Sequence, residues 1–392
     1  MKTSPDRILT THVGSLPRPQ SLLDILLAQD QGQPFDQAAL DAASADAVRD
    51  CVRRQVEAGI DSISDGEMSK PAYTFYVRHR LTGIGDASQV AGVAPKRPTH
   101  ADVAEFPELA EARAKARAGS ANSLPQYCVG DIAYKDTSAL EKDIANMQAA
   151  MEDASGREAF MNAASPGVLA IFMPNTHYAT EDLYVEALAE AMRTEYERIV
   201  EAGFVLQLDC PDIGMGRHTF YQKETEADYL RKVARNVEAL NHATRNIPPE
   251  MLRLHICWGN YPAPHTLDIP VTKLFPYLLP SRPQAFVFEA ANPRHEHEWQ
   301  DWADAKLPDD KILIPGVIDS TSNYVEHPRL IAQRIRRFVD IVGCERVIAG
   351  TDCGFGTFAG MGHVYPSIVW AKFRAMSEGA ELASQQLKGK AA

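Results

Sequence analysis

The chain has 392 residues, of which 45% are hydrophobic and 23% are charged, a composition typical of a soluble globular protein with a substantial core. Its formal net charge of -12 argues against broad contact with nucleic acid or with an anionic membrane surface. No apolar run has the length of a membrane span, no secretory signal is visible and the six scattered cysteines fit no disulfide scaffold, so we expect a reduced, cytoplasmic setting.

Short apolar runs alternate with amphipathic segments along most of the chain. Residues 181–202 place apolar side chains three and four positions apart, as one buried helix face requires, and residues 46–58, 226–241, 328–342 and 366–377 are also amphipathic. Strands that alternate with helices imply parallel βα units, so the sequence predicts one α/β domain over residues 1–392, a (β/α)8 TIM barrel. The candidate strands are residues 8–13, 62–65, 167–172, 204–209, 253–258, 285–289, 312–318 and 346–351.

Residues 71–166 interrupt this alternation. They include the Ala-, Arg- and Glu-rich segment ADVAEFPELAEARAKARAG and a candidate strand at 127–132. We predict a largely helical insertion after the second strand that covers the mouth of the barrel, with its charges on a solvated helix face. The tail, about residues 380–392, is predicted to be frayed.

Polar and reactive residues gather at the ends of the predicted strands. Active sites of such barrels lie at the C-terminal ends of the strands, so residues from distant parts of the sequence are expected to meet there. The motifs at these ends are THVGS, SDGE, FMPN, LQLDCPD, HICWGN, VFEAAN and TDCGFG.

Four potential zinc ligands lie at three of these strand ends. One residue separates His255 from Cys257, so an extended strand points both side chains to the same face, which in a barrel is the interior. Glu289 ends the sixth strand and Cys353 ends the eighth. A His-x-Cys pair alone also suits core packing, but the placement of all four donors favours a zinc site with one exchangeable position.

A second acidic and histidine-rich stretch, residues 295–298, follows Glu289. We interpret it as a solvated helix start on the outside of the barrel, with His295 and Glu298 as fallback metal ligands.

With THVGSLPRP, SDGE and LQLDCPD, these donors resemble the catalytic barrel of cobalamin-independent methionine synthase, which shares its fold with uroporphyrinogen decarboxylase. The resemblance covers about residues 8–375 and implies that zinc binds the thiol of homocysteine. It implies that Ser15, Glu67 and Asp209 hold the amino acid part, and we add His12 and Asn175 as candidate substrate-binding residues. The zinc ligands that it implies are His255, Cys257, Glu289 and Cys353.

The sequence departs from the family pattern at several places. The family has a second barrel, for which 392 residues leave no room, and Cys210 stands in place of an acidic residue after Asp209. The folate-site tryptophan motif is replaced by a segment with Asn175, His177 and Tyr178, and residues 317–321 lack the usual histidine. FMPN, LQLDCPD and TDCGFGTF look more like the branch that contains epoxyalkane:coenzyme M transferase, so the thiol and its alkylating partner stay open.

Zinc coordination deprotonates a bound thiol, and the thiolate then attacks a saturated carbon. The leaving group needs a proton donor, for which we favour His177 and Tyr178, with Asp209 as a further catalytic residue. Two carboxylates suit an ammonium group, whereas a sulfonate would need an arginine nearby. Further candidate proton donors are His12 and His363, and the candidate arginines are Arg18, Arg78 and Arg217.

The sequence therefore predicts a zinc-dependent thiol S-methyltransferase or alkyltransferase, similar to 5-methyltetrahydropteroyltriglutamate–homocysteine S-methyltransferase of methionine biosynthesis. The alternatives are an epoxide-opening thiol transferase, a metal-free uroporphyrinogen-decarboxylase-like lyase, and a non-catalytic thiol-binding or metal-storage protein. The expected partners are a small thiol and an alkyl or methyl donor, with no nucleic acid and no membrane. A methyl-donor partner protein and a homo-oligomer are left open.

Overall fold

The computed structural model describes residues 1–90, 100–118 and 125–390. Eight parallel strands form an almost closed barrel in the order β1-β10-β9-β8-β7-β6-β5-β2, which confirms the predicted (β/α)8 architecture. A hydrogen bond of 3.1 Å from the Asp61 N–H to the Thr10 carbonyl lies across the seam between β1 and β2. The barrel strands are β1 (Leu9–Thr10), β2 (Ser62–Ile63), β5 (Glu158–Ala164), β6 (Val205–Asp209), β7 (Leu252–His255), β8 (Ala285–Phe288), β9 (Ile312–Ile318) and β10 (Ile348–Thr351).

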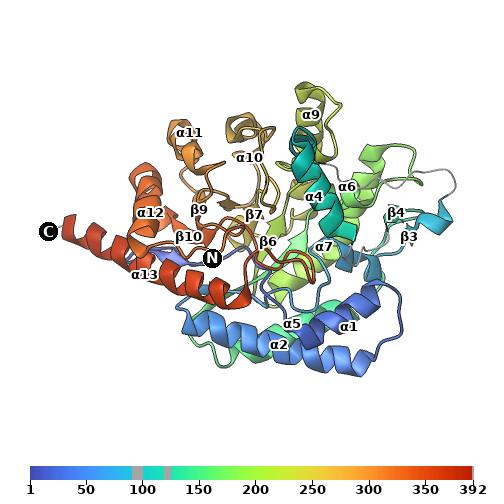
Figure 1. Cartoon of the computed structure of the whole chain (residues 1–392), viewed down its shortest axis with the longest axis horizontal. Coiled ribbons are helices and arrows are strands. Elements are labelled where there is room, and N and C mark those ends of the chain that lie inside the picture. Colours follow the sequence, from blue (N-terminus) through green and yellow to red (C-terminus); the bar gives the residue numbers. More distant parts are fainter. Residues whose placement is uncertain (91–99, 119–124, 391–392) are drawn as a thin grey trace.

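Helices surround the strands, and α9 to α13 follow one another around the outside in chain order (Figure 1). None of the helices within the described ranges combines the length and the apolar character needed to cross a membrane. The helices of this outer layer are α1 (Gln20–Asp30), α2 (Gln37–Glu57), α5 (Ser138–Met151), α6 (Pro166–Phe172), α7 (Glu181–Glu201), α8 (Gly216–Thr219), α9 (Glu226–Ala243), α10 (Phe275–Leu278), α11 (Trp299–Asp304), α12 (Pro328–Val342) and α13 (Pro366–Lys390). Short 3-10 turns are η3 (Pro249–Met251), η4 (Val271–Lys273), η5 (Glu296–Glu298) and η6 (Cys344–Arg346).

Two apolar layers make up the core. Alternate residues of a strand point to opposite faces, so one set fills the barrel interior and the other packs beneath the helices. Within the described ranges, the buried members of the interior cluster are Val13, Ala285, Val287, Ile312, Ile314 and Ile348.

The third strand was predicted in the wrong place. Residues 167–172 belong to helix α6, and the third barrel strand is β5, which begins at Glu158. Ser165 caps this helix by accepting the Val168 N–H at 3.1 Å, and Pro166 occupies its first turn. A six-residue apolar run is compatible with a buried strand and with a buried helix, so periodicity did not distinguish them.

The insertion lies between β2 and α5, and because β5 begins at Glu158, the barrel pattern resumes before residue 166. Arg80 anchors its base through ion pairs to Asp143 of α5 and to Glu195 of α7, the second at 3.0 Å. Its elements are η1 (Phe75–His79), β3 (Ile84–Asp86), η2 (Ala87–Gln89), α3 (Ala101–Ala104), α4 (Pro107–Ala118) and β4 (Gln126–Cys128), with β3 and β4 antiparallel.

The expected fraying of the tail is also wrong for the described part of the chain. Helix α13 continues to Lys390, and Ala380, Ala383 and Ser384 are buried against the barrel. The Ser384 hydroxyl accepts the Ile8 N–H at 2.9 Å, so the last turns of α13 are fixed to the N-terminal segment. Residues 391–392 lie outside the described ranges.

Candidate metal centre

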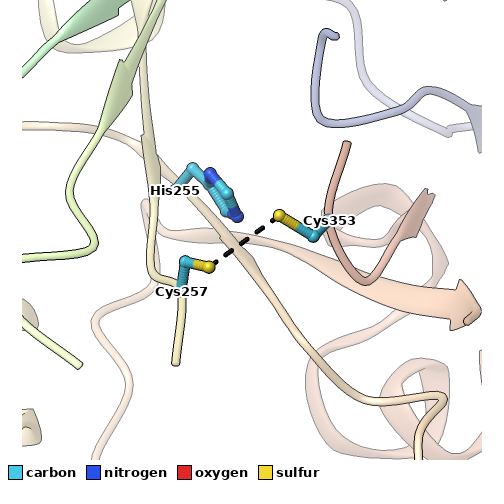
Figure 2. Close-up of side chains that lie close together, drawn as sticks. All are labelled: His255, Cys257 and Cys353. Carbon is cyan, nitrogen blue, oxygen red and sulfur yellow. Dashed lines mark hydrogen bonds between the residues drawn. The ribbon is translucent and has the colours of Figure 1, made fainter. Parts of the chain in front are cut away.

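Three of the four predicted metal ligands converge at the C-terminal rim of the barrel. His255 is the last residue of β7, Cys257 lies two residues further on, and Cys353 lies two residues beyond β10. Their side chains point toward one another from opposite sides of a shared space (Figure 2). One ligand atom from each lies within 4.8 Å of the other two, and all three residues are buried.

The spacing of these atoms fits a tetrahedral metal ion. The Sγ atoms of Cys257 and Cys353 are 3.8 Å apart, which is too far for a disulfide. Two thiolates bound to one zinc at ~2.3 Å in a tetrahedron are separated by about 3.8 Å. The Nε2 atom of His255 is buried and has no hydrogen-bond partner among the described residues, so a donor is available for the same ion.

Asp209 fixes the orientation of this imidazole. Its carboxylate lies 3.0 Å from the Nδ1 atom of His255, and β6 pairs with β7 so that the two residues are neighbours in register. Asn162 and Gln207 donate to the same carboxylate at 3.0 and 3.2 Å. A metal-bound histidine usually donates its other ring N–H to a carboxylate in this way, because the bond fixes the tautomer and raises the basicity of the ligand.

The two buried thiols lie too close together for both to ionise without a nearby positive charge. The Gly259 N–H donates to Cys257 Sγ at 3.2 Å. The hydrogen bond with Cys257 and then burial raise the pKa of the Cys353 thiol well above its usual range. Two adjacent buried thiolates repel each other, so the pair ionises fully only with a positive charge between them.

Glu289, the fourth predicted ligand, is turned to other partners. Its Oε1 atom accepts the Trp258 N–H at 2.9 Å, and its Oε2 atom accepts from Asn292 at 2.8 Å and from Arg294 at 2.5 Å. Burial raises the pKa of this carboxyl, but the charges of Arg294 and His295, the Trp258 N–H and His265 together lower it overall. The structure therefore gathers a three-donor set and leaves Glu289 beside it in an ion pair.

A cavity of about 790 Å³ opens beside the three donors. Ser15, Glu67 and Asp209, the residues predicted to hold an amino acid group, lie in its wall together with His255 and Cys257. A cluster of aromatic rings forms much of the remaining wall, with centroids 5.2 to 6.0 Å apart. These rings belong to Tyr73, Phe75, Phe172, Phe220 and Phe358.

Glu67 has an unusual backbone conformation and a side-chain carboxyl with an unusual pKa. Its φ of 55° lies in the left-handed region, which a side chain other than glycine rarely adopts. Its Oε2 atom is buried and has no hydrogen-bond partner among the described residues. Burial raises the pKa of Glu67 to about 7 against the opposing attraction of Lys70. Such strain and such a pKa are typical of a functional position.

The insertion supplies one side of the cavity. His100 precedes α3, Arg113 belongs to α4, and both line the cavity. The His100 ring lies 4.2 Å from the Tyr261 ring, and the Arg113 guanidinium lies 4.7 Å from the same ring. Part of the charge that was predicted to be a solvated helix face therefore faces the site.

His12 does not reach the cavity. It is buried between Phe160 and Phe373, with Nε2 2.6 Å from Gln55 Oε1 and with Nδ1 accepting the Gly14 N–H at 3.1 Å. Burial lowers the pKa of His12 to about 3, so the ring is neutral. The described contacts of His12 are structural, and its assignment to substrate binding stays a prediction.

The favoured proton donors also lie outside the cavity wall. His177 is exposed and its Nε2 atom lies 2.8 Å from Asp131, while the Tyr178 hydroxyl accepts the Ile132 N–H at 2.9 Å. Asn175 accepts the backbone N–H groups of His177 and Tyr178, and so shapes their turn. The loop after α6 thus places these side chains against residues 131 and 132, between β4 and α5, and neither lines the cavity. Proton donors that do line the cavity are Tyr73, His100, Tyr261 and His363.

Asn260 is a cavity residue that the sequence did not single out. Its amide donates to Gly354 O at 2.7 Å and to Thr357 at 3.0 Å, and accepts from Ser320 at 2.9 Å. It thus ties together the loops after β7, β9 and β10. The signal was present in the Gly259–Asn260 pair at a strand end, but only the fold shows which loops are neighbours.

The interpretation of residues 295–298 was wrong for two of its members. His295 and Glu298 are buried, and they interact with each other at 3.0 Å. His295 Nε2 also lies 3.0 Å from Asp268. They belong to a second group of histidines and acids rather than to a solvated surface.

The chain is similar over nearly its whole length to curated methionine synthases of archaea. It is 24% identical over 384 residues to that of Saccharolobus solfataricus, covering 97% of this chain and 96% of the relative. It is 23% identical over 352 residues to that of Thermococcus kodakarensis, covering 88% and 86%. No family model matches the chain.

Solved structures share the fold. A B12-independent methionine synthase from Shewanella in complex with selenomethionine gives a TM-score of 0.69 at 18% identity and covers 98% of this chain and 99% of its own. A putative vitamin-B12 independent methionine synthase from Listeria monocytogenes gives 0.64 at 18%, with 96% and 98% covered. Together with the archaeal relatives, these matches confirm the resemblance stated from the motifs, whereas the closer likeness to the epoxyalkane:coenzyme M transferase branch stays a prediction.

Proposed function

We propose that this chain, which resembles the cobalamin-independent methionine synthases over its whole length, is a zinc-dependent S-methyltransferase that acts on homocysteine or a similar aminothiol. The observation that carries the proposal is the convergence of His255, Cys257 and Cys353 at the edge of a cavity whose wall also holds the carboxyl groups of Glu67 and Asp209. Relatives of nearly the same length carry the name methionine synthase, so the activity does not demand a second barrel.

The charges of the cavity favour an aminothiol over a thiol with a sulfonate. Glu67 and Asp209 offer two carboxylates for an ammonium group, and Ser15 offers a hydroxyl. The three arginines named from the sequence as candidates for a sulfonate have other partners. Arg18 donates to Gly356 O and Glu67 O, Arg78 pairs with Asp30, and Arg217 donates to Tyr221 O.

Each residue then has a task that follows from its contacts. When bound, zinc supplies the Lewis acidity that lowers the pKa of the substrate thiol, so that a thiolate is present at neutral pH. Asp209 holds the His255 ring with Nε2 toward the shared space, and Asn260 holds the loop that carries Cys353 against the loop that carries Cys257. Glu67 and Ser15 orient the amino acid end so that its sulfur reaches the donors.

The aromatic rings of the cavity wall form the environment of the methyl donor. Phe172 and Phe358 flank Tyr73 in the cavity wall and exclude water from the reacting carbon, which strengthens electrostatic interactions there. A lyase for acidic pyrroles would need several arginines in this place, and Arg113 is the arginine that lines the cavity within the described residues.

The proposal is tested by metal content and by thiol selectivity in the same preparations. We expect one tightly held zinc at the three-donor site. Cys353→Ser is expected to weaken its binding by at least about 100-fold, since loss of a group that only hydrogen-bonds to a ligand already costs about 10- to 100-fold. Methyl iodide serves as a small methyl donor, so the assay does not require the natural donor to be known. Mass spectrometry then compares S-methylation of homocysteine with that of 2-mercaptoethanesulfonate.

The matched control is Cys344→Ser, because Cys344 is half-buried, its thiol donates to Ser4 O at 3.2 Å, and it does not line the cavity. This variant is expected to keep zinc and homocysteine methylation. A zinc stoichiometry in Cys353→Ser equal to that of the unaltered protein would refute the three-donor site, and faster methylation of the sulfonate than of homocysteine would refute the aminothiol.

A further inference from the structure

Two buried histidines and a partly buried aspartate form a second donor group apart from the His–Cys–Cys set. His218 lies in α8, and His265 and Asp268 lie in the loop that follows β7. One ligand atom of each is within 4.8 Å of the other two. His218 Nδ1 is 3.1 Å from Asp268 Oδ1, and His265 Nδ1 is 2.9 Å from Asp268 Oδ2. The side chains of both histidines are fully buried.

The outer nitrogens of both rings have partners that fix their protons. His265 Nε2 is 3.0 Å from the Tyr261 carbonyl, which only accepts, so this nitrogen carries a proton. His218 Nε2 is 3.0 Å from the Tyr261 hydroxyl, whose own proton can go to Asp102. In this arrangement the Nδ1 atoms present lone pairs to the Asp268 carboxylate.

Lone pairs of two imidazoles and a carboxylate repel one another unless a cation or extra protons lie between them. His218 Nδ1 makes no well-aligned hydrogen bond to any described residue although it is buried and close to Asp268. A metal ion bound to His218 Nδ1 would explain why this buried nitrogen faces the group without a hydrogen-bond partner.

We propose that His218, His265 and Asp268 bind a divalent first-row transition-metal ion at a second site. Ligand atoms bound tetrahedrally at about 2.0–2.1 Å are about 3.3 Å apart, close to the distances to Asp268. Two imidazoles and one carboxylate suit zinc, iron(II), cobalt or nickel better than magnesium or calcium, which prefer oxygen ligands. The set contains no thiolate, so its chemistry differs from that of the first site.

The surroundings of the site resemble an outer coordination shell. His295 Nε2 is 3.0 Å from Asp268 Oδ2, and its Nδ1 is 3.0 Å from Glu298 Oε2, so the ligating carboxylate is itself held. Ligating histidines and carboxylates in metalloproteins are commonly supported by such outer hydrogen bonds.

The second site also joins the insertion to the cavity wall. Asp102 of α3 accepts the His265 N–H at 2.9 Å and interacts with the Tyr261 hydroxyl at 3.3 Å. The φ of His265 is 55°, a strained backbone that needs fixed surroundings. An ion on this group therefore holds Tyr261, and with it the insertion, in place beside the substrate.

Metal content and cobalt spectra of four proteins test this inference. Metal-stripped protein is titrated with cobalt(II), and we expect two equivalents per chain. The double variant Cys257→Ser/Cys353→Ser is expected to keep one equivalent, whose spectrum lacks sulfur-to-cobalt charge-transfer bands. The double variant His218→Gln/Asp268→Asn is expected to keep the other equivalent with these bands intact. The control is His242→Gln, an exposed histidine paired with Glu190, which should keep both.

The outcomes separate the two sites and guard against misfolding. Intact charge-transfer bands in His218→Gln/Asp268→Asn show that this variant is folded, and the cysteine variant leaves the second group untouched. One equivalent in the unaltered protein together with none in the cysteine variant would overturn the inference and leave the group as a proton-sharing network. Two equivalents retained by His218→Gln/Asp268→Asn would overturn it as well. If the cobalt spectrum of the unaltered protein shows no sulfur-to-cobalt charge-transfer bands, this result would count against the proposed function and not against the second site.

Discussion

The position of a single residue on its strand decides whether its side chain reaches the candidate metal centre. His255 and Cys257 share a face because one residue separates them, and Asp209 lies beside them because β6 and β7 are in parallel register. Glu67 adds a carboxyl held in an uncommon state by burial. The pH dependence of substrate binding should therefore report on Glu67.

Replacement of Glu67 by Gln is expected to raise KM for an aminothiol by about 10- to 100-fold with a smaller change in kcat, because a hydrogen bond to a charged group contributes about 1.5–3 kcal/mol. The carboxylate binds an ammonium group only when ionised, so protonation weakens binding. With a pKa of about 7 for Glu67, kcat/KM should fall as the pH drops below that value and level off above it.

The measurement is kcat/KM for homocysteine between about pH 5.5 and about pH 8.5 in the two proteins. The acidic limb should vanish in Glu67→Gln and persist in Glu57→Gln, an exposed residue of α2 that serves as control. An unchanged acidic limb in Glu67→Gln would assign the titration to another group.

At the scale of elements, the end of β5 and the start of α6 decide where the third strand stops. Ser165 accepts the Val168 N–H and donates to Asp212 at 2.8 Å, so one hydroxyl caps the helix and satisfies a buried carboxyl. This turn brings α6 against the barrel, and the same helix places Phe172 in the cavity wall.

Ser165→Ala should lower the free energy of unfolding by about 2 kcal/mol, since loss of an N-cap costs about 1 kcal/mol and a buried acceptor without its donor adds a similar amount. Urea unfolding followed by circular dichroism measures the change. Ser138→Ala, at the exposed start of α5, is the control and should have little effect because its side chain caps no helix. Equal stability of the two variants would show that the Ser165 hydroxyl does not hold this junction.

At the scale of the whole molecule, α13 completes the wall of helices that began with α2. Lys372 of α13 is fully buried and donates to both oxygens of Glu326 at 2.8 and 3.0 Å. Glu326 also accepts the Asp319 N–H at 2.8 Å, so the pair connects the C-terminal helix to the loop after β9. That loop carries Ser320, which donates to Asn260 in the cavity.

Lys372→Met is expected to lower the free energy of unfolding by about 3–5 kcal/mol, because it leaves a buried carboxylate without its counter-ion. The double variant Lys372→Met/Glu326→Gln should recover part of this loss, since the remaining amide oxygen can still accept the Asp319 N–H. Denaturant unfolding of both variants gives the comparison. A loss below about 0.5 kcal/mol in Lys372→Met would mean that water reaches the pair and screens it.

The sequence by itself determined the barrel and the two strand ends that carry His255, Cys257 and Cys353. It could do so because side-chain direction alternates along a strand, because amphipathic helices such as α7 and α12 have a clear period, and because parallel strands bring their C-terminal ends to one rim.

Only the tertiary structure decided the rest, because it depended on contacts between loops distant in the sequence. The apolar run of α6 carried no distinguishing period, the turn at Asn175 directed His177 away from the cavity, and Arg294 drew Glu289 into an ion pair. His218 and Asp268 are far apart in the chain, and only the packing of α8 against the loop after β7 turned them into one group.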